Sequence, residues 1–109
     1  METTPLKQTM DLSSKVAIVT GGAMGIGFGI AYRLAEAGAS VVIGDMNKVA
    51  ALESAAKLAA KGWKAVGVEV DVSDAKQVAR MMDAAVSTYG GIDILVNNAG
   101  IYPNVRVMQ

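Results

Sequence analysis

The chain has 109 residues, of which 52% are hydrophobic, and its 10 basic and 10 acidic residues leave no net charge. This composition excludes an intrinsically disordered chain and gives no reason to expect nucleic acid as a partner, while the length predicts one domain with its own core. The absence of cysteine and histidine removes disulfides, thiolate metal sites and the commonest general base, and no apolar run approaches the roughly 20 residues of a membrane span.

The N-terminal segment, residues 1–14, is polar and has no apolar core. We therefore predict an N-terminal extension and not a signal peptide, with the domain itself over residues 15–109. Together with the missing membrane span, these features favour a cytoplasmic protein.

From Lys15 onward, strands and helices alternate with short connections. The predicted elements, in chain order, are a strand over Lys15–Thr20, a helix over Ile26–Ala37, a strand over Ser40–Asp45, a helix over Lys48–Lys61, a strand over Ala65–Val70, a helix over Asp74–Tyr89 and a strand over Ile92–Asn97. Each helix is followed by a glycine that is expected to end it, at Gly38, Gly62 and Gly90.

The spacing of apolar residues predicts which face of each helix is turned toward the sheet. The predicted stripes are Ile26, Ile30 and Leu34 in the first helix, Leu52, Ala56 and Ala59 in the second, and Val78, Met82, Ala85 and Val86 in the third. Asn47 and Ser73 are the predicted N-caps of the second and third helices, because their side-chain oxygens can accept a free backbone N–H.

The alternation of strands and helices predicts the fold class. Nearly continuous apolar strands indicate a parallel sheet covered on both faces, and hence an α/β protein. With right-handed crossovers we expect a Rossmann-type doubly wound sheet with strand order 3-2-1-4. The order reverses between the first and fourth strands, so Gly21 and Asn97 should flank one crevice at the carboxyl ends of the strands.

A glycine-rich turn, Gly21-x-x-x-Gly25-x-Gly27, joins the first strand to the first helix. Gly21 permits a sharp turn at positive φ, Gly25 permits the backbone to approach phosphates, and Gly27 permits the helix to lie close to the strand. In this setting backbone N–H groups and a helix N-terminus grip a pyrophosphate, so we predict dinucleotide binding. The alternative is a tight turn without a ligand.

A carboxylate, Asp45, ends the second predicted strand at about the spacing of roughly 20 residues expected for a ribose-binding acid. Its charge would repel a 2′-phosphate, which favours NAD over NADP. A basic residue beside the glycine turn or after this strand would favour NADP, and those places hold Met24 and Met46. The alternative role for Asp45 is that of an acid favoured by the dipole of the following helix.

Three motifs resemble those of one known family. Thr20–Gly27 resembles the Thr-Gly-x-x-x-Gly-Ile-Gly motif of the short-chain dehydrogenases and reductases, and Asn97–Gly100 resembles their Asn-Asn-Ala-Gly motif. Asp71-Val72, after the third predicted strand, is similar to the pair that contacts adenine in that family. The resemblance extends from about Lys15 to Ile101. Taken with Asp45, it implies that NAD is bound by Gly21, Met24, Gly25, Ile26, Gly27, Asp45, Met46, Asp71, Val72, Asn97, Asn98, Ala99 and Gly100.

Two of these motifs also have structural explanations. Asp71 would serve equally as a strand-end turn residue that leads to a cap at Ser73. Asn97 and Asn98 would serve as a turn, or as a bridge between neighbouring strands, because an amide both donates and accepts hydrogen bonds.

The resemblance implies an oxidoreductase that transfers hydride between nicotinamide and a secondary alcohol or ketone. The family's catalytic Tyr-x-x-x-Lys pair has no counterpart here. Tyr102 is followed by Arg106, but Pro103 disfavours a helix between them and arginine does not replace lysine. We therefore predict that this chain supplies the cofactor-binding part, is inactive alone, and ends before the catalytic residues of a longer enzyme.

The expected partners are the C-terminal half of that enzyme, further copies in a homo-oligomer, and a small alcohol or ketone. Neither nucleic acid nor a membrane is expected. Two alternatives stay open: a nucleotide-binding or regulatory module without catalysis, and an NADP-dependent member of the same family.

Overall fold

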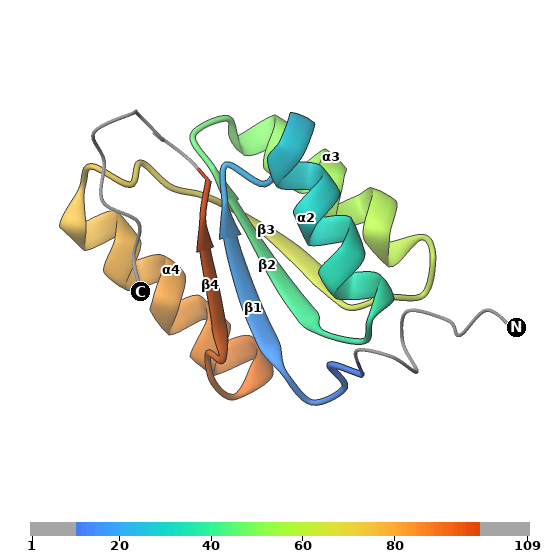
Figure 1. The fold of residues 1–109 in the computed structure, drawn as a ribbon. Coiled ribbons are helices and arrows are strands. Elements are labelled where there is room, and N and C mark those ends of the chain that lie inside the picture. The colour runs from blue at the N-terminus through green and yellow to red at the C-terminus, as the bar shows by residue number, and fades with distance from the viewer. Residues whose placement is uncertain (1–10, 99–109) are drawn as a thin grey trace, which may run out of the picture.

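Residues 11–98 of the chain are described by a computed structural model, drawn as a ribbon in Figure 1. The elements, in chain order, are β1 (Val16–Thr20), α2 (Gly25–Glu36), β2 (Ser40–Asp45), α3 (Lys48–Ala59), β3 (Ala65–Glu69), α4 (Ala75–Tyr89) and β4 (Ile94–Asn97). They are the predicted elements, and their boundaries differ from the predicted ones by at most two residues. The predicted α/β class is confirmed.

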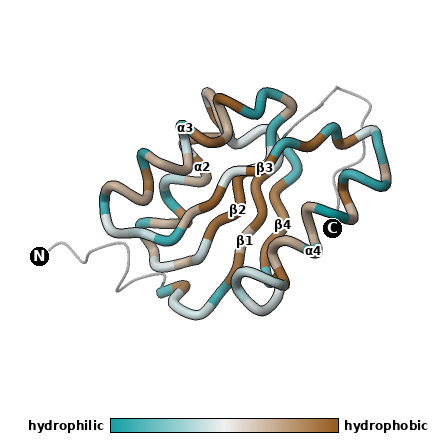
Figure 2. The backbone as a smooth tube through the Cα atoms, turned by 180° about the vertical axis from the view of Figure 1, so that it is seen from behind, coloured by the Kyte–Doolittle hydropathy of each residue, from teal (hydrophilic) through white to brown (hydrophobic). Residues whose placement is uncertain are grey.

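Within these residues the strands form one parallel sheet with the predicted order, β3-β2-β1-β4. Helices α2 and α3 cover one face, and α4 covers the other (Figure 1). The central strands β1 and β2 are buried along almost their whole length, which explains why their sequences are continuously apolar. Figure 2 shows the same contrast, with hydrophobic colour along the strands and mixed colour along the helices.

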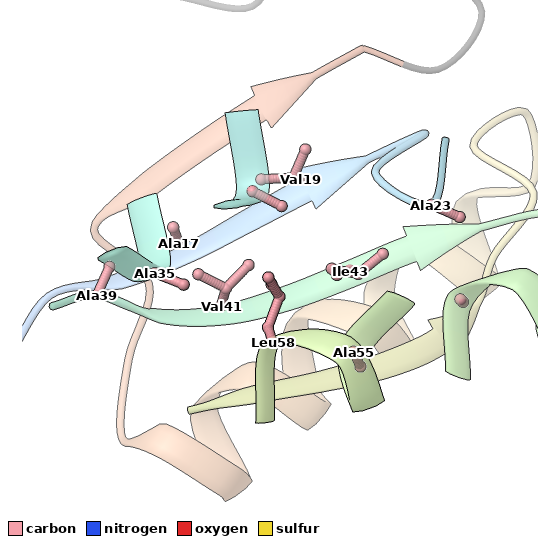
Figure 3. Packing of buried hydrophobic residues seen from close by; sticks show 11 residues of the cluster. Ala17, Val19, Ala23, Ala35, Ala39, Val41, Ile43, Ala55 and Leu58 are labelled. Carbon is pink, nitrogen blue, oxygen red and sulfur yellow. The ribbon is translucent and has the colours of Figure 1, made fainter. Parts of the chain in front are cut away.

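Successive residues of the central strands contribute to two separate core layers, because side chains alternate across a sheet. Val19 and Ile43 belong to the layer beneath α2 and α3, where Leu58 is fully buried. Figure 3 shows this layer from close by. Ile18 and Val42 belong to the opposite layer, beneath α4.

The predicted inner stripe of α2 was wrong by one residue. The buried residues are Gly27, Ala31 and Ala35, whereas Ile26 is 77% exposed. Ile30 and Leu34 are half-buried at the side of this layer. The small side chains face the sheet because α2 lies close to the turn after β1, where no larger side chain fits at its first turn.

The inner faces of the other helices also differ from the prediction. In α3 all three predicted inner residues are exposed, Leu52 at 48% together with Ala56 and Ala59. In α4, Val86 is 51% exposed. Val78 and Met82 are half-buried against the layer beneath α4, and Ala85 is buried as predicted. The residues that are buried are Ala51, Ser54, Ala55 and Leu58 in α3, and Met81 and Ala85 in α4.

One of the two predicted N-caps is confirmed. The Asn47 side chain accepts a hydrogen bond of 3.0 Å from the Ala50 N–H at the start of α3. At the start of α4 the cap is Asp74, whose carboxylate accepts from the Lys76 N–H at 2.9 Å. The prediction of Ser73 was wrong, because its hydroxyl instead donates to the Asp71 carboxylate.

None of the helices in the described part of the chain is both long and apolar enough to cross a membrane.

Candidate functional site

The carboxyl ends of the strands bring most of the predicted site residues to one edge of the sheet. In the strand register, Thr20 of β1 lies beside Gly44 of β2 and Asn97 of β4, and Asp45 lies beside Glu69 of β3. The glycine turn therefore follows β1 between the ends of its two neighbours. Ala99 and Gly100, and the Tyr102–Arg106 pair, lie outside the described residues.

Gly21 has the positive φ that its place in the turn predicts, 66°. Gly25 has a positive φ as well, of 57°, in the left-handed region that favours glycine. A Cβ atom on Gly25 would meet no atom within 4 Å. The backbone at Gly25 therefore borders open space, as a phosphate-binding backbone must.

Gly27 is held at close approach to the turn itself. A Cβ atom there would overlap the Gly21 carbonyl oxygen and lie 2.8 Å from Nδ2 of Asn98. The prediction that Gly27 lets the helix lie close to the strand is refined, because the close contact is with the turn that follows β1.

The first turn of α2 is the only helix start among residues 11–98 without a side-chain cap. Met24 occupies the N-cap position and makes no capping hydrogen bond, and the first turn contains no acidic residue. The N–H groups at a helix start have no partner within the helix, and they carry the positive end of the helix dipole. This end of α2 can therefore accept an anion.

Asp45 connects the glycine turn to the start of α3. Its Oδ2 accepts from the Ala23 N–H at 3.3 Å, and its Oδ1 accepts from the Asn47 N–H at 3.0 Å. Asp45 is half-buried, and each of its carboxylate oxygens has the lone pairs to accept more than one hydrogen bond. Both roles considered for Asp45, as a local acid before a helix and as a ligand group, are thus compatible with its position.

Asn97 and Asn98 bridge β4 to β1, as their amide chemistry allows. The Thr20 hydroxyl donates to Oδ1 of Asn97 at 2.8 Å. Nδ2 of Asn98 donates to the Gly21 carbonyl at 3.3 Å. Asn98 therefore contacts the glycine turn directly and helps to fix its position.

Asp71 forms a compact turn after β3. Its Oδ1 accepts from the Ser73 N–H at 2.9 Å and from the Ser73 hydroxyl at 2.7 Å, and these hydrogen bonds hold the pKa of Asp71 below its ordinary value of 3.8. The Asp71 N–H donates to Oε1 of Gln77 at 2.9 Å. The structural explanation of Asp71 as a turn residue is therefore correct, although the cap it leads to is Asp74.

Two clefts lie at this edge of the sheet. One of about 210 Å³ brings together Met46 and Asp71. It is lined by Met46, Glu69, Val70, Asp71 and Gln77. The other, of about 150 Å³, is mostly apolar and lies between Thr20, Asn97 and α4, with Val72 in its lining. The predicted residues thus line two neighbouring clefts with the glycine turn and Asp45 beside them.

Two residues that contact the turns at this edge of the sheet were not predicted from the sequence. Ser54 on α3 donates to the Ala23 carbonyl, and Gln77 on α4 fixes the turn at Asp71. Ser54 lies in the interior of α3, so no local motif marks it. Gln77 lies in the first turn of α4, three residues after the N-cap Asp74, and this spacing is typical of a capping box. A polar residue within a buried helical stripe is the signal that identifies Ser54.

The sequence profile of the family described as short chain dehydrogenase matches residues 15–109. The 3beta-hydroxysteroid dehydrogenase 2 of Eggerthella lenta is 47% identical over 94 residues, which cover 86% of this chain and 36% of that protein. The diacetyl reductase [(S)-acetoin forming] of Staphylococcus epidermidis is 43% identical over 88 residues, covering 81% of this chain and 34% of that protein.

Among solved structures, the crystal structure of hydroxysteroid dehydrogenase from Escherichia coli matches with a TM-score of 0.80 and 41% sequence identity. The match covers 84% of this chain and 37% of that one. The chain thus spans about a third of the length of the relatives that it matches. Because the profile matches most of its length, the chain belongs to the short-chain dehydrogenase family.

Proposed function

We propose that this chain forms the NAD-binding part of a dehydrogenase or reductase that transfers hydride between nicotinamide and a secondary alcohol or ketone. The observation that carries the proposal is the uncapped start of α2 behind a glycine turn, with Asp45 beside it at the carboxyl edge of a doubly wound sheet. Ligands bind such sheets at this place. The family to which the chain belongs uses nicotinamide cofactors.

The residues of the turn fit a pyrophosphate. The open space beside Gly25 gives the phosphate oxygens access to the backbone. The uncapped N–H groups of α2 supply donors, and the helix dipole favours negative charge there. Met24 and Ile26, which are 67% and 77% exposed, would form the apolar rim of this site.

Asp45 would bind the ribose of the adenosine half. Its carboxylate would accept hydrogen bonds from the ribose hydroxyls and would repel the 2′-phosphate of NADP. Met24 and Met46 supply no cation to offset that repulsion. The adenine would lie in the cleft lined by Met46 and Asp71. Val72, the next residue along the chain, lines the neighbouring cleft.

The bound cofactor supplies the hydride acceptor or donor, and this chain's residues orient it. Asn97 and Asn98, with the Ala99–Gly100 segment that follows, would line the pocket on the β4 side. The named activities of the relatives, on hydroxysteroid and diacetyl, concern alcohols and ketones, which supports that substrate class for the whole enzyme. We assign the proton-transfer residues to a C-terminal half, and expect the 109-residue chain alone to be inactive.

The cofactor is tested by equilibrium titration of the full-length enzyme with NAD and with NADP. We expect NAD to bind more tightly. Asp45→Ala should weaken NAD binding by about 1.5–3 kcal/mol, because a hydrogen bond to a charged group is lost. The difference between the affinities for NAD and NADP should become smaller as a result. Asp83→Ala is the control, because Asp83 is an exposed acid on α4 and is not among the residues of the proposed site. It should leave the affinities for NAD and NADP unchanged.

Equal or tighter binding of NADP by the unmodified enzyme would contradict the assignment of Asp45 and favour the NADP-dependent alternative. Cofactor binding by a full-length protein that turns over no alcohol or ketone would favour a binding or regulatory module.

A further inference from the structure

Ala23, in the middle of the glycine turn, is held through both of its backbone polar groups. Its N–H donates to Oδ2 of Asp45 at 3.3 Å. Its carbonyl accepts a hydrogen bond of 2.7 Å from the hydroxyl of Ser54, which lies 31 residues further along the chain. Figure 3 labels Ala23 at one end of the core layer beneath α2 and α3.

Ser54 is a polar residue within an otherwise apolar stripe. It is 4% exposed, and its buried neighbours on α3 are Ala51, Ala55 and Leu58. Serine in a helix interior commonly bonds to a carbonyl of the preceding turn of its own helix. Here the hydroxyl reaches out of α3 to the glycine turn, so the contact couples the helix to the site.

The contact also orients the next N–H along the turn. A peptide bond is planar and trans, so the N–H of Met24 points opposite to the carbonyl of Ala23. Because Ser54 holds that carbonyl toward the interior, the Met24 N–H is turned toward the exposed side of the turn. That side borders the open space next to Gly25.

We propose that Ser54 is a positioning residue, which fixes the Ala23–Met24 peptide so that its N–H faces the cofactor's pyrophosphate. The inference rests on the proposed function, because it assigns a role within the same site. It predicts a loss of affinity that is specific to ligands with a pyrophosphate. A purely structural role would instead lower the affinity for every ligand of the site or lower stability alone.

The test uses full-length enzyme with Ser54→Ala, Ser54→Thr and Ser87→Ala. Ser87 is a matched control, since its hydroxyl also donates to a backbone carbonyl, that of Asp83 within α4. The probes are ADP-ribose, which contains the pyrophosphate, and adenosine, which lacks it. Melting temperatures without ligand report on the fold.

We expect Ser54→Ala to weaken ADP-ribose binding about tenfold, which corresponds to about 1.4 kcal/mol, and to change adenosine binding much less. Ser54→Thr, which keeps the hydroxyl, should retain most of the ADP-ribose affinity, and Ser87→Ala should match the unmodified enzyme. Equal weakening of both ligands, no weakening of either, or failure of Ser54→Ala to fold would overturn the positioning role. If the unmodified enzyme binds neither probe, the proposed function itself fails.

Discussion

Gly27 shows at the scale of one residue how tightly the candidate site is built. Its Cα lies so close to the turn that any side chain would displace the Gly21 carbonyl or the Asn98 amide. Gly25 has a different constraint, because it has a positive φ but free space around it. The two glycines therefore serve the turn for different reasons, one through close approach and the other through backbone conformation.

Substitution of Gly27 should damage cofactor binding more than folding. In the full-length enzyme we expect Gly27→Val to abolish measurable NAD binding, because the turn must move to accommodate the side chain. Gly29→Ala is the matched control, since a Cβ at this helical glycine meets nothing within 4 Å. It should bind NAD normally and gain up to about 1 kcal/mol of stability. Calorimetric titration and thermal unfolding measure the two effects, and normal NAD binding by a folded Gly27→Val variant would exclude the turn as the phosphate site.

Asp71 should titrate below its ordinary pKa because the hydrogen bonds from Ser73 favour the ionised carboxylate. A lowered pKa means that this stabilisation is fully present above the unfolded-state value, near 3.8, and is lost as the pH falls through the folded-state pKa. Ser73→Ala removes the hydroxyl donor and should raise the pKa of Asp71 toward its ordinary value. NMR titration of the carboxyl carbon measures the shift, and an unchanged pKa in Ser73→Ala would assign the effect to the Ser73 N–H alone.

At the scale of single elements, the sequence predicted where helices and strands lie better than it predicted which way the helices face. The pattern of large apolar residues selected Ile26 in α2 and Leu52 in α3, both of which are exposed. Helices that approach a sheet closely turn small residues toward it. In α2 the contact of Gly27 with the turn fixes the rotation of the helix, and this is a tertiary contact that periodicity cannot detect.

At the start of α4 the structure differs from the sequence prediction in the residue that caps the helix. Asp74 accepts from the N–H groups of Lys76 and Gln77, whereas Ser73 makes no capping contact. Asp74→Ala should therefore destabilise the protein by about 1 kcal/mol, the usual cost of losing an N-cap. Chemical denaturation measures the loss, and Ser73→Ala should cost less. A larger loss in Ser73→Ala would restore Ser73 as the cap.

At the scale of the whole molecule, the topology accounts for what could be predicted of the site. Parallel strands that alternate with helices bring their carboxyl ends to one edge, so the pattern alone predicted that Gly21 and Asn97 lie at the same edge. In the structure Asn97 lies beside Thr20, the residue before Gly21. Ser54 was not predicted, because its contact depends on how α3 packs against that edge. Gln77 was also missed, although its contact with Asp71 is local and its place three residues after the Asp74 N-cap is a sequence signal.

The opposite edge of the sheet has another cavity that could hold a ligand. A larger cavity, of about 560 Å³, lies at the amino ends of the strands, where Val16, Ser40 and Lys64 line it together with Tyr89. Size alone would favour this cavity. The uncapped helix start and the glycine turn are at the carboxyl edge, and the chemistry of a dinucleotide favours that edge despite its smaller clefts.

Hydrogen exchange of the full-length enzyme with and without NAD tests most directly whether the cofactor binds at the carboxyl edge of the sheet. We expect NAD to slow exchange at the backbone amides of residues 21–27, with smaller protection at 45–47, 71–72 and 97–98. The amides around the opposite cavity, residues 13–16 and 62–64, should exchange at the same rate in both states. Protection confined to the opposite cavity, with the glycine turn unaffected, would contradict the assignment of the carboxyl edge as the cofactor site.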